Sequence, residues 1–312
     1  MRSPSSGVPL QSPREGQTFM GGSRLVKYAN FVKLPHTVFA LPFALVGVTL
    51  ASYHAPVHWS TLGWVVLAFT CARFTGMGFN RIVDRDIDQV NPRTSMREIP
   101  SGVMSVREAS LAVGTASLLF VGAAYRLNPL CAWLSPLALG WVCFYSYTKR
   151  FTRWSHLVLG MGMSIAPVGG YLAVTGQWPD PWWMPLLLSL AVTTWGGGFD
   201  ILYALQDEHF DRLHGLHSMP AALGQRRAIV LSRGLHLTTV LALAAVGVAT
   251  GAGALYASGV AVTALLLLYE HSLVKTGDLS RINAAFFTMN GVISILFFLF
   301  VLGERATRSM NR

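Results

Sequence analysis

Two short segments hold most of the acidic residues of this chain, and both carry them at helical spacing. They contribute Asn80, Asp84 and Asp88 in the first segment and Asp200, Asp207 and Asp211 in the second. Positions i, i+4 and i+8 of a helix share one face, and so do i, i+7 and i+11, so each segment is expected to present a row of oxygen atoms. Hard oxygen donors suit Mg2+, which is usually shared with the phosphates of a substrate. We predict that all six residues are catalytic and that all but Asp200 are metal ligands.

The two segments also align with each other at a constant offset of 123 residues. The offset maps Asp84 onto Asp207, Asp88 onto Asp211 and Ser95 onto Ser218. It indicates a duplicated helix unit whose acidic loops face each other across one cavity. A single Asp-x3-Asp is commonly a helix cap or a solvated charge. Two matching copies, each at the end of an apolar run, favour a functional role because burying ionisable groups near a membrane is costly.

Basic and aromatic residues accompany both acidic rows. Arg93 and Arg97 are four residues apart, a spacing that suits a joint grip on phosphate oxygens. The alternative for each basic pair is an anchor on the inner side of a membrane. The candidate substrate-binding residues are Arg73, Arg93, Arg97, Lys149, Arg150, Tyr145 and Tyr203.

Arg73 differs from the other basic residues because it lies within an apolar run. It precedes Asn80 by seven residues and therefore shares its helix face. An unpaired arginine at such a place is expensive, so an anionic partner is expected. A carboxylate on a bound substrate and the side chain of Asp200 are both candidates.

The composition identifies the elements that must position these residues. Of the 312 residues, 52% are hydrophobic and only 12% are charged, and the mean hydropathy is +0.46. Soluble domains carry about 25% charged residues, so a soluble enzyme and a disordered protein are both excluded. The net charge of +10 comes from basic residues spread between apolar runs, which favours loops at an anionic membrane surface over nucleic-acid binding.

We predict an all-α, polytopic membrane protein of nine transmembrane helices around a central cavity. The expected spans are 34–53, 61–80, 107–125, 128–146, 156–176, 183–204, 228–250, 252–271 and 283–303. The loops 54–60 and 177–182 contain no Lys or Arg, which places them outside and both acidic segments on the cytoplasmic side. The expected organisation is a disordered tail (1–23), a transmembrane domain (24–304) and a short basic tail (305–312).

Together these motifs resemble the UbiA superfamily of intramembrane aromatic prenyltransferases, from about residue 25 to residue 303. The matching patterns are Asn80-x3-Asp84-x3-Asp88, Arg93-x3-Arg97-x2-Pro100, Lys149-Arg150 and Asp200-x2-Tyr203-x3-Asp207-x3-Asp211. Arg73 stands where the 4-hydroxybenzoate enzymes of this family carry an arginine. Arg81 is a departure, since many members have an aspartate directly after the asparagine.

The resemblance implies a transfer reaction in quinone biosynthesis. Mg2+ ions on the aspartate rows bind the diphosphate of a polyprenyl donor, while Arg93, Arg97 and Lys149 stabilise it as it departs. A ring carbon of a hydroxylated aromatic carboxylate then attacks the allylic carbon. The segment from Lys33 to His36 is similar to the 4-hydroxybenzoate branch, and the alternative acceptor is 1,4-dihydroxy-6-naphthoate of the futalosine route to menaquinone.

The resemblance also implies a location and partners. We expect a bacterial inner (plasma) membrane with the active site on the cytoplasmic side, the lipid bilayer as surroundings, no nucleic acid and no obligate protein partner.

An ion-coupled membrane transporter is the alternative of another class. It predicts acidic residues near the bilayer midplane and broken helices.

Overall fold

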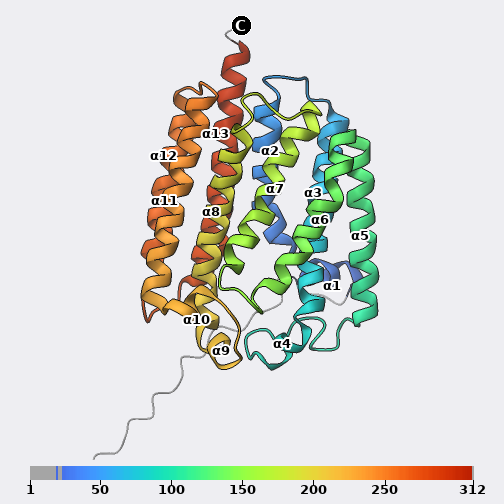
Figure 1. The fold of residues 1–312 in the computed structure, drawn as a ribbon, viewed down its shortest axis with the longest axis vertical. Coiled ribbons are helices and arrows are strands. Elements are labelled where there is room, and N and C mark those ends of the chain that lie inside the picture. Colours follow the sequence, from blue (N-terminus) through green and yellow to red (C-terminus); the bar gives the residue numbers. More distant parts are fainter. Residues whose placement is uncertain (1–18, 20–22, 311–312) are drawn as a thin grey trace, which may run out of the picture.

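The computed structural model describes residue 19 and residues 23–310 (Figure 1). These residues form a bundle of long, roughly parallel helices, and no strand occurs among them. The predicted all-α membrane fold is therefore confirmed. The tail expected at 1–23 lies outside the described residues except for Phe19 and Ser23.

Each predicted span falls on one long helix. The long helices are α2 (Leu34–Ala51), α3 (Trp59–Val83), α5 (Val106–Leu127), α6 (Pro129–Thr148), α7 (Ser155–Thr175), α8 (Met184–Ala204), α11 (Gln225–Ala249), α12 (Ala254–Leu273) and α13 (Asn290–Met310). Within the part of the chain that the structure describes, eight helices are long and apolar enough to cross a membrane, and α2 contributes a shorter apolar stretch, Ala40–Ala51. The multi-pass architecture is confirmed, and the count of nine stays a prediction.

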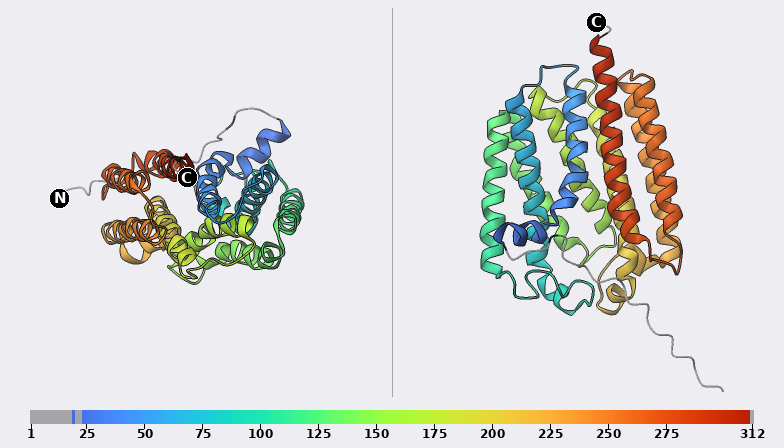
Figure 2. Two further views of the ribbon diagram at one scale, coloured as in Figure 1. Left: turned by 90° about the horizontal axis from the view of Figure 1, so that it is seen from above. Right: turned by 180° about the vertical axis from the view of Figure 1, so that it is seen from behind.

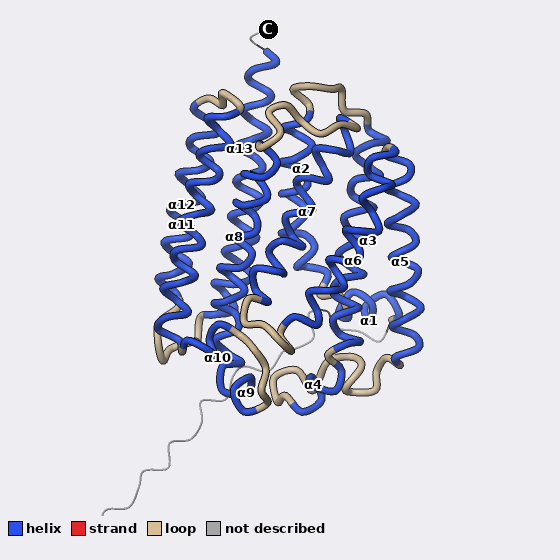
Figure 3. Tube along the Cα trace, in the orientation of Figure 1, coloured by secondary structure: helices blue, strands red, loops and turns tan. Residues whose placement is uncertain are grey.

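Six short elements complete the chain. They are α1 (Arg24–Phe31), α4 (Arg85–Val90), the 3-10 turn η1 (Leu205–Asp207), α9 (Glu208–Leu213), α10 (Met219–Leu223) and the π-helical turn η2 (Ala284–Met289). The first and last residues of α4 each lie 123 positions before the first and last residues of α9, as a duplicated unit predicts. Both helices lie at the same end of the bundle (Figure 3), and the loops that lack Lys and Arg lie at the other.

The helix α7 packs closely on α2 and α8 because glycines leave room for neighbouring backbone. A Cβ atom on Gly47 of α2 would lie 1.9 Å from the carbonyl oxygen of Pro167, and one on Gly160 of α7 would lie 2.2 Å from that of Thr193. Small residues at such crossings are how membrane helices approach each other. Viewed along the helices, the bundle curves round until α13 packs against α2 (Figure 2).

The helix α13 extends to Met310. The described part of the expected basic tail, 305–310, is therefore helical. Arg305 donates to the Ser52 hydroxyl at 2.8 Å, and Arg308 donates to Glu304 at 2.7 Å. These contacts give the positive charges at the C-terminal end of α13 local partners.

Candidate active site

Asp84 lies at the junction of α3 and α4 and is almost fully buried, with 1% of its surface exposed. Its carboxylate accepts a hydrogen bond from Asn80 Nδ2 at 2.9 Å. It also forms ion pairs with Lys149 Nζ at 2.8 Å and Arg150 Nη2 at 3.2 Å. A buried carboxylate is tolerated only when paired in this way. The first acidic segment is thus joined to the end of α6.

The predicted row is bent rather than carried by one continuous helix. A turn at Asp84 separates α3 from α4, although the backbone bonds from Asp84 to Asn80 and from Asp88 to Asp84, both 2.8 Å, keep the i, i+4 spacing. Asp88 therefore has a different partner from Asp84. Arg97 Nη1 lies 2.9 Å from both of its oxygens. The second row is interrupted in the same way by η1.

Arg93 crosses from the first acidic loop to the second. Its Nε donates to Asp207 Oδ1 at 2.9 Å, and its Nη2 lies 2.5 Å from Asp207 Oδ2. Asn91 donates to the same carboxylate at 3.3 Å, and Arg93 Nη1 donates to the Tyr203 hydroxyl at 3.1 Å. The two acidic loops therefore meet, as the offset predicted. Arg93 and Arg97 do not act as one fork, because each holds a different aspartate.

Arg81 pairs with an acidic residue of the loop that follows α4. Its guanidinium lies 3.5 Å from Glu98, and both side chains are largely buried. The departure from the family pattern is therefore accommodated by an acidic partner in the following loop.

Asp200 has a partner that the sequence did not indicate. Its Oδ2 lies 2.7 Å from Nδ1 of His156, the second residue of α7. Asp211 lies in α9 and accepts a hydrogen bond from Ser218. The histidine carried no local motif. Its only signal was a polar side chain at the start of an apolar span.

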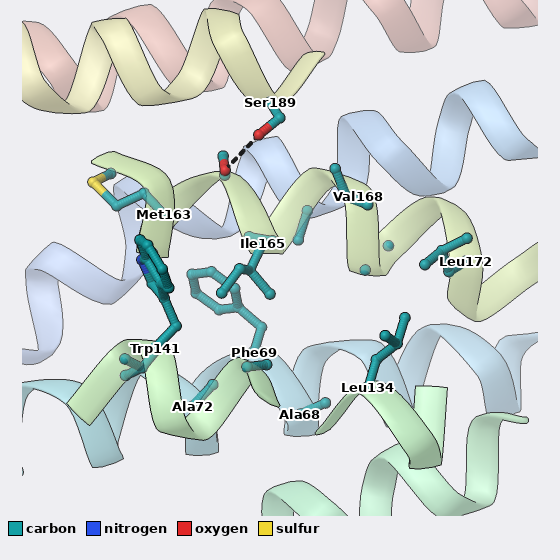
Figure 4. A pocket seen from close by; sticks show the side chains of 18 of the residues that line it. Ala68, Phe69, Ala72, Leu134, Trp141, Met163, Ile165, Val168, Leu172 and Ser189 are labelled. Atoms are coloured by element: carbon teal, nitrogen blue, oxygen red, sulfur yellow. Dashed lines mark hydrogen bonds between the residues drawn. The ribbon is translucent and has the colours of Figure 1, made fainter. Parts of the chain in front are cut away.

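A cavity of about 570 Å³ lies between α2, α3, α5, α6, α7 and α8 (Figure 4). Its walls are apolar, with side chains such as Phe69, Leu134 and Ile165 facing the space in Figure 4. The few polar residues that line the cavity are Arg73, Ser135, Tyr145, Ser164 and Ser189. Pockets of this size and character suit ligands that are mostly hydrophobic.

Among the residues that the structure describes, none pairs with the buried Nε of Arg73. Asp200, one of the two expected partners, is engaged by His156 instead. Tyr145 lies near Arg73 and is electrostatically coupled to it, to Asp84 and to Asp200. Within the described residues, the cavity therefore contains a guanidinium without an anionic partner.

The donor atoms of the site fit a hard divalent cation, since they are carboxylate and amide oxygens. No three His, Cys, Asp or Glu side chains gather closely enough to enclose a metal ion within the described ranges. Asp84, Asp88 and Asp207 each hold a Lys or Arg side chain instead. A metal ion at these residues therefore requires the cations to find other anionic partners.

Comparisons with known proteins identify a family. Residues 40–297 match the UbiA prenyltransferase family. The 4-hydroxybenzoate octaprenyltransferase of Aromatoleum aromaticum is 33% identical over 232 residues, which are 74% of this chain and 77% of that protein. The enzyme of the same name from Yersinia pseudotuberculosis is 28% identical over 232 residues, which are 74% of this chain and 79% of its own.

Solved structures show the same fold. The apo structure of a UbiA homologue from Aeropyrum pernix K1 has a TM-score of 0.78 at 33% identity and covers 88% of this chain and 98% of its own. A UbiA homologue from Archaeoglobus fulgidus bound to GPP and Mg2+ has a TM-score of 0.71 and covers 90% of this chain and 99% of its own. At 20% identity, the second supports the fold alone.

The transporter alternative required acidic residues at the bilayer midplane, whereas the motif aspartates lie at one end of the bundle, within the last turns of α8 or at and beyond the ends of α3 and α8. The family match spans most of the chain and contains every motif that suggested it. The chain therefore belongs to the UbiA prenyltransferase family and is a multi-pass membrane prenyltransferase.

Proposed function

We propose that the protein transfers a polyprenyl group from polyprenyl diphosphate to a ring carbon of 4-hydroxybenzoate, with Mg2+ as cofactor. The observation that carries this proposal is Arg73, whose buried Nε has no partner inside an apolar cavity. A buried cation without an anion is costly. A ligand with one carboxylate on an aromatic ring pairs the carboxylate with the guanidinium and packs the ring against the apolar walls.

The donor diphosphate is expected to bind at the acidic loops. Lys149, Arg93 and Arg97 supply positive charge there, and each is held in place by an aspartate. When the diphosphate arrives, these side chains exchange carboxylate oxygens for phosphate oxygens, which are strong acceptors for charged donors. Their charge then opposes the charge that develops on the leaving group.

The metal ion belongs with the same residues. Asn80, Asp84, Asp88, Asp207 and Asp211 are the oxygen donors that would hold it. When bound, Mg2+ neutralises charge on the departing diphosphate. The supporting observation is chemical, because the donor set contains oxygen atoms and neither a cysteine nor a histidine.

The cavity walls protect the reacting carbon from water. Phe69, Leu134 and Trp141 are among the side chains that line it, and an apolar site of this kind suppresses the capture of an allylic cation by water. Exposed apolar lining residues such as Leu137 and Leu186 give an isoprenoid chain contact with lipid. We place this active site at the cytoplasmic face of a bacterial plasma membrane, supported by the bias of Lys and Arg towards that end.

The test is an assay of purified membranes with Mg2+ and a polyprenyl diphosphate. One reaction contains 4-hydroxybenzoate and a second contains 1,4-dihydroxy-6-naphthoate, because both carry the carboxylate that Arg73 recognises. EDTA-sensitive prenylation of 4-hydroxybenzoate is the expected result, in line with the activity named for the relatives from Aromatoleum and Yersinia. Product with the naphthoate alone would move the protein to the menaquinone route, and product with neither would refute both acceptors.

A further inference from the structure

His156 and Asp200 form a pair between the inner ends of α7 and α8. The histidine is 4% exposed, and its Nδ1 lies 2.7 Å from Asp200 Oδ2. Its Nε2 accepts a hydrogen bond from the backbone nitrogen of Met219 at 3.2 Å. A backbone N–H only donates, so Nε2 carries no proton. The proton of the neutral ring therefore sits on Nδ1 and is donated to Asp200.

Asp200 differs from the other motif aspartates in the partner it keeps. Asp84, Asp88 and Asp207 each form an ion pair with Lys or Arg, whereas Asp200 is held, among the described residues, by the neutral ring of His156. Only Oδ2 of Asp200 is engaged, and the side chain retains 25% exposure. Asp200 is thus free of the cations that serve the diphosphate.

The location of Asp200 connects it to the acceptor rather than to the donor. Arg73 and Tyr145 line the cavity together with Ser189 and Val192 of α8. Asp200 follows these two residues by eleven and eight positions and therefore continues the same face of α8. An acceptor whose carboxylate is held at Arg73 therefore lies on the side of the cavity that Asp200 approaches. No other carboxylate of the two motifs combines this location with an oxygen not held by Lys or Arg.

The proposed reaction needs a proton acceptor at this place. The C–O bond of the donor breaks and its electron pair leaves with the diphosphate, while a π pair of the ring forms the new C–C bond. The C–H bond at the same ring carbon then breaks, its electron pair restores the aromatic ring, and the proton must be taken up. We infer that His156 is a positioning residue that fixes the Asp200 carboxylate so that its second oxygen receives this proton. The inference rests on the proposed function.

Two amide substitutions separate this role from packing. In His156→Asn, the side-chain nitrogen occupies roughly the position of Nδ1 and keeps the donor to Asp200. In His156→Gln, the side-chain oxygen occupies roughly the position of Nε2, which keeps the bond from Met219 and removes that donor. His214→Gln is the matched control, because His214 belongs to the second acidic loop and is exposed.

The measurements are kcat, the KM for each substrate, and the kinetic isotope effect with acceptor deuterated at the ring carbons that accept the prenyl group. We expect His156→Gln to lower kcat by roughly 10- to 100-fold with little change in either KM. We also expect it to raise the isotope effect above that of the wild type, because proton removal becomes slow. His156→Asn is expected to recover part of the rate, and His214→Gln to match the wild type.

A merely structural histidine predicts a different pattern. Wild-type kcat in His156→Gln would overturn the inference, and so would an equal loss in both variants without a change in the isotope effect. Wild-type protein that prenylates neither acceptor would instead overturn the proposed function itself. The isotope effect distinguishes these results because it reports proton removal and not the amount of folded enzyme.

Discussion

Replacing Arg73 by methionine should weaken binding of the acceptor and leave the stability of the protein unchanged or higher. The side chain lies within α3, lines the cavity and leaves its buried Nε without a partner. In the protein without substrate, this guanidinium is a cost, since a buried polar group lacks its hydrogen bond. With an aromatic carboxylate bound, the same group supplies a charged hydrogen bond. Methionine fills a similar volume, has no donor that needs a partner, and cannot form a hydrogen bond with the carboxylate.

The magnitude follows from the contact that is lost. A hydrogen bond to a charged group contributes about 1.5–3 kcal/mol. Since about 1.4 kcal/mol corresponds to a factor of ten, the KM for the acceptor should rise roughly 10- to 150-fold. The KM for the polyprenyl diphosphate should change little, because Lys149, Arg93 and Arg97 are left intact. The thermal midpoint in detergent should stay the same or increase, since the unsatisfied group is gone.

The assay measures the KM for both substrates in membranes and the unfolding midpoint of the purified protein. Arg126→Met is the control, because Arg126 ends α5 and is exposed, and it should leave both values of KM unchanged. A larger rise in the KM for the donor would refute the reasoning and assign Arg73 to the diphosphate. A marked fall in the thermal midpoint would show that the guanidinium has a structural partner.

The other predictions concern the carboxylates, the metal ion and the packing of α7. Asp84→Asn should lower turnover by about 100-fold or more while the protein remains at wild-type levels in the membrane, and near-normal turnover would contradict the role given to that carboxylate. Activity lost on treatment with EDTA should return with Mg2+, and persistence in EDTA would exclude a divalent cation. Gly47→Ala places a methyl group 1.9 Å from the Pro167 carbonyl oxygen and should destabilise the protein by about 1–3 kcal/mol. Gly63→Ala meets nothing within 4 Å and should stabilise it by about 0.5–1 kcal/mol, so equal unfolding midpoints for these two variants would refute the packing argument.

The fold was predictable because a bilayer leaves the backbone few options. Every N–H and C=O group in the hydrocarbon must be satisfied within its own segment, so apolar runs of about 20 residues are read as helices with little ambiguity. The helix α2 shows where this reading is weakest, since Pro35 and Pro42 lie in it and its apolar stretch is the shortest. Spacing and composition also predicted which acidic and basic residues would share one end of the bundle.

The pairing within the site was not predictable. Arg93 and Arg97 lie in a segment of turns, where helical periodicity says nothing about direction, and they bind different aspartates. The contact between His156 and Asp200 spans 44 residues and two helices. Neither residue type is unusual where it occurs, so only the crossing of α7 and α8 reveals the pair. Motif spacing thus locates a site, while the loops and helix crossings decide its hydrogen bonds.

The cations of the site link the binding of metal ion and donor. Lys149 and Arg93 lie 2.8 Å and 2.5 Å from the carboxylates of Asp84 and Asp207. If a divalent cation alone took those carboxylates, positive side chains would be left in the cluster without an anion. If the diphosphate alone took the cations, buried carboxylates would be left unpaired, and either state is costly. Both costs vanish only when metal ion and diphosphate enter together, so the ion pairs in this structure favour binding of the donor as its metal complex.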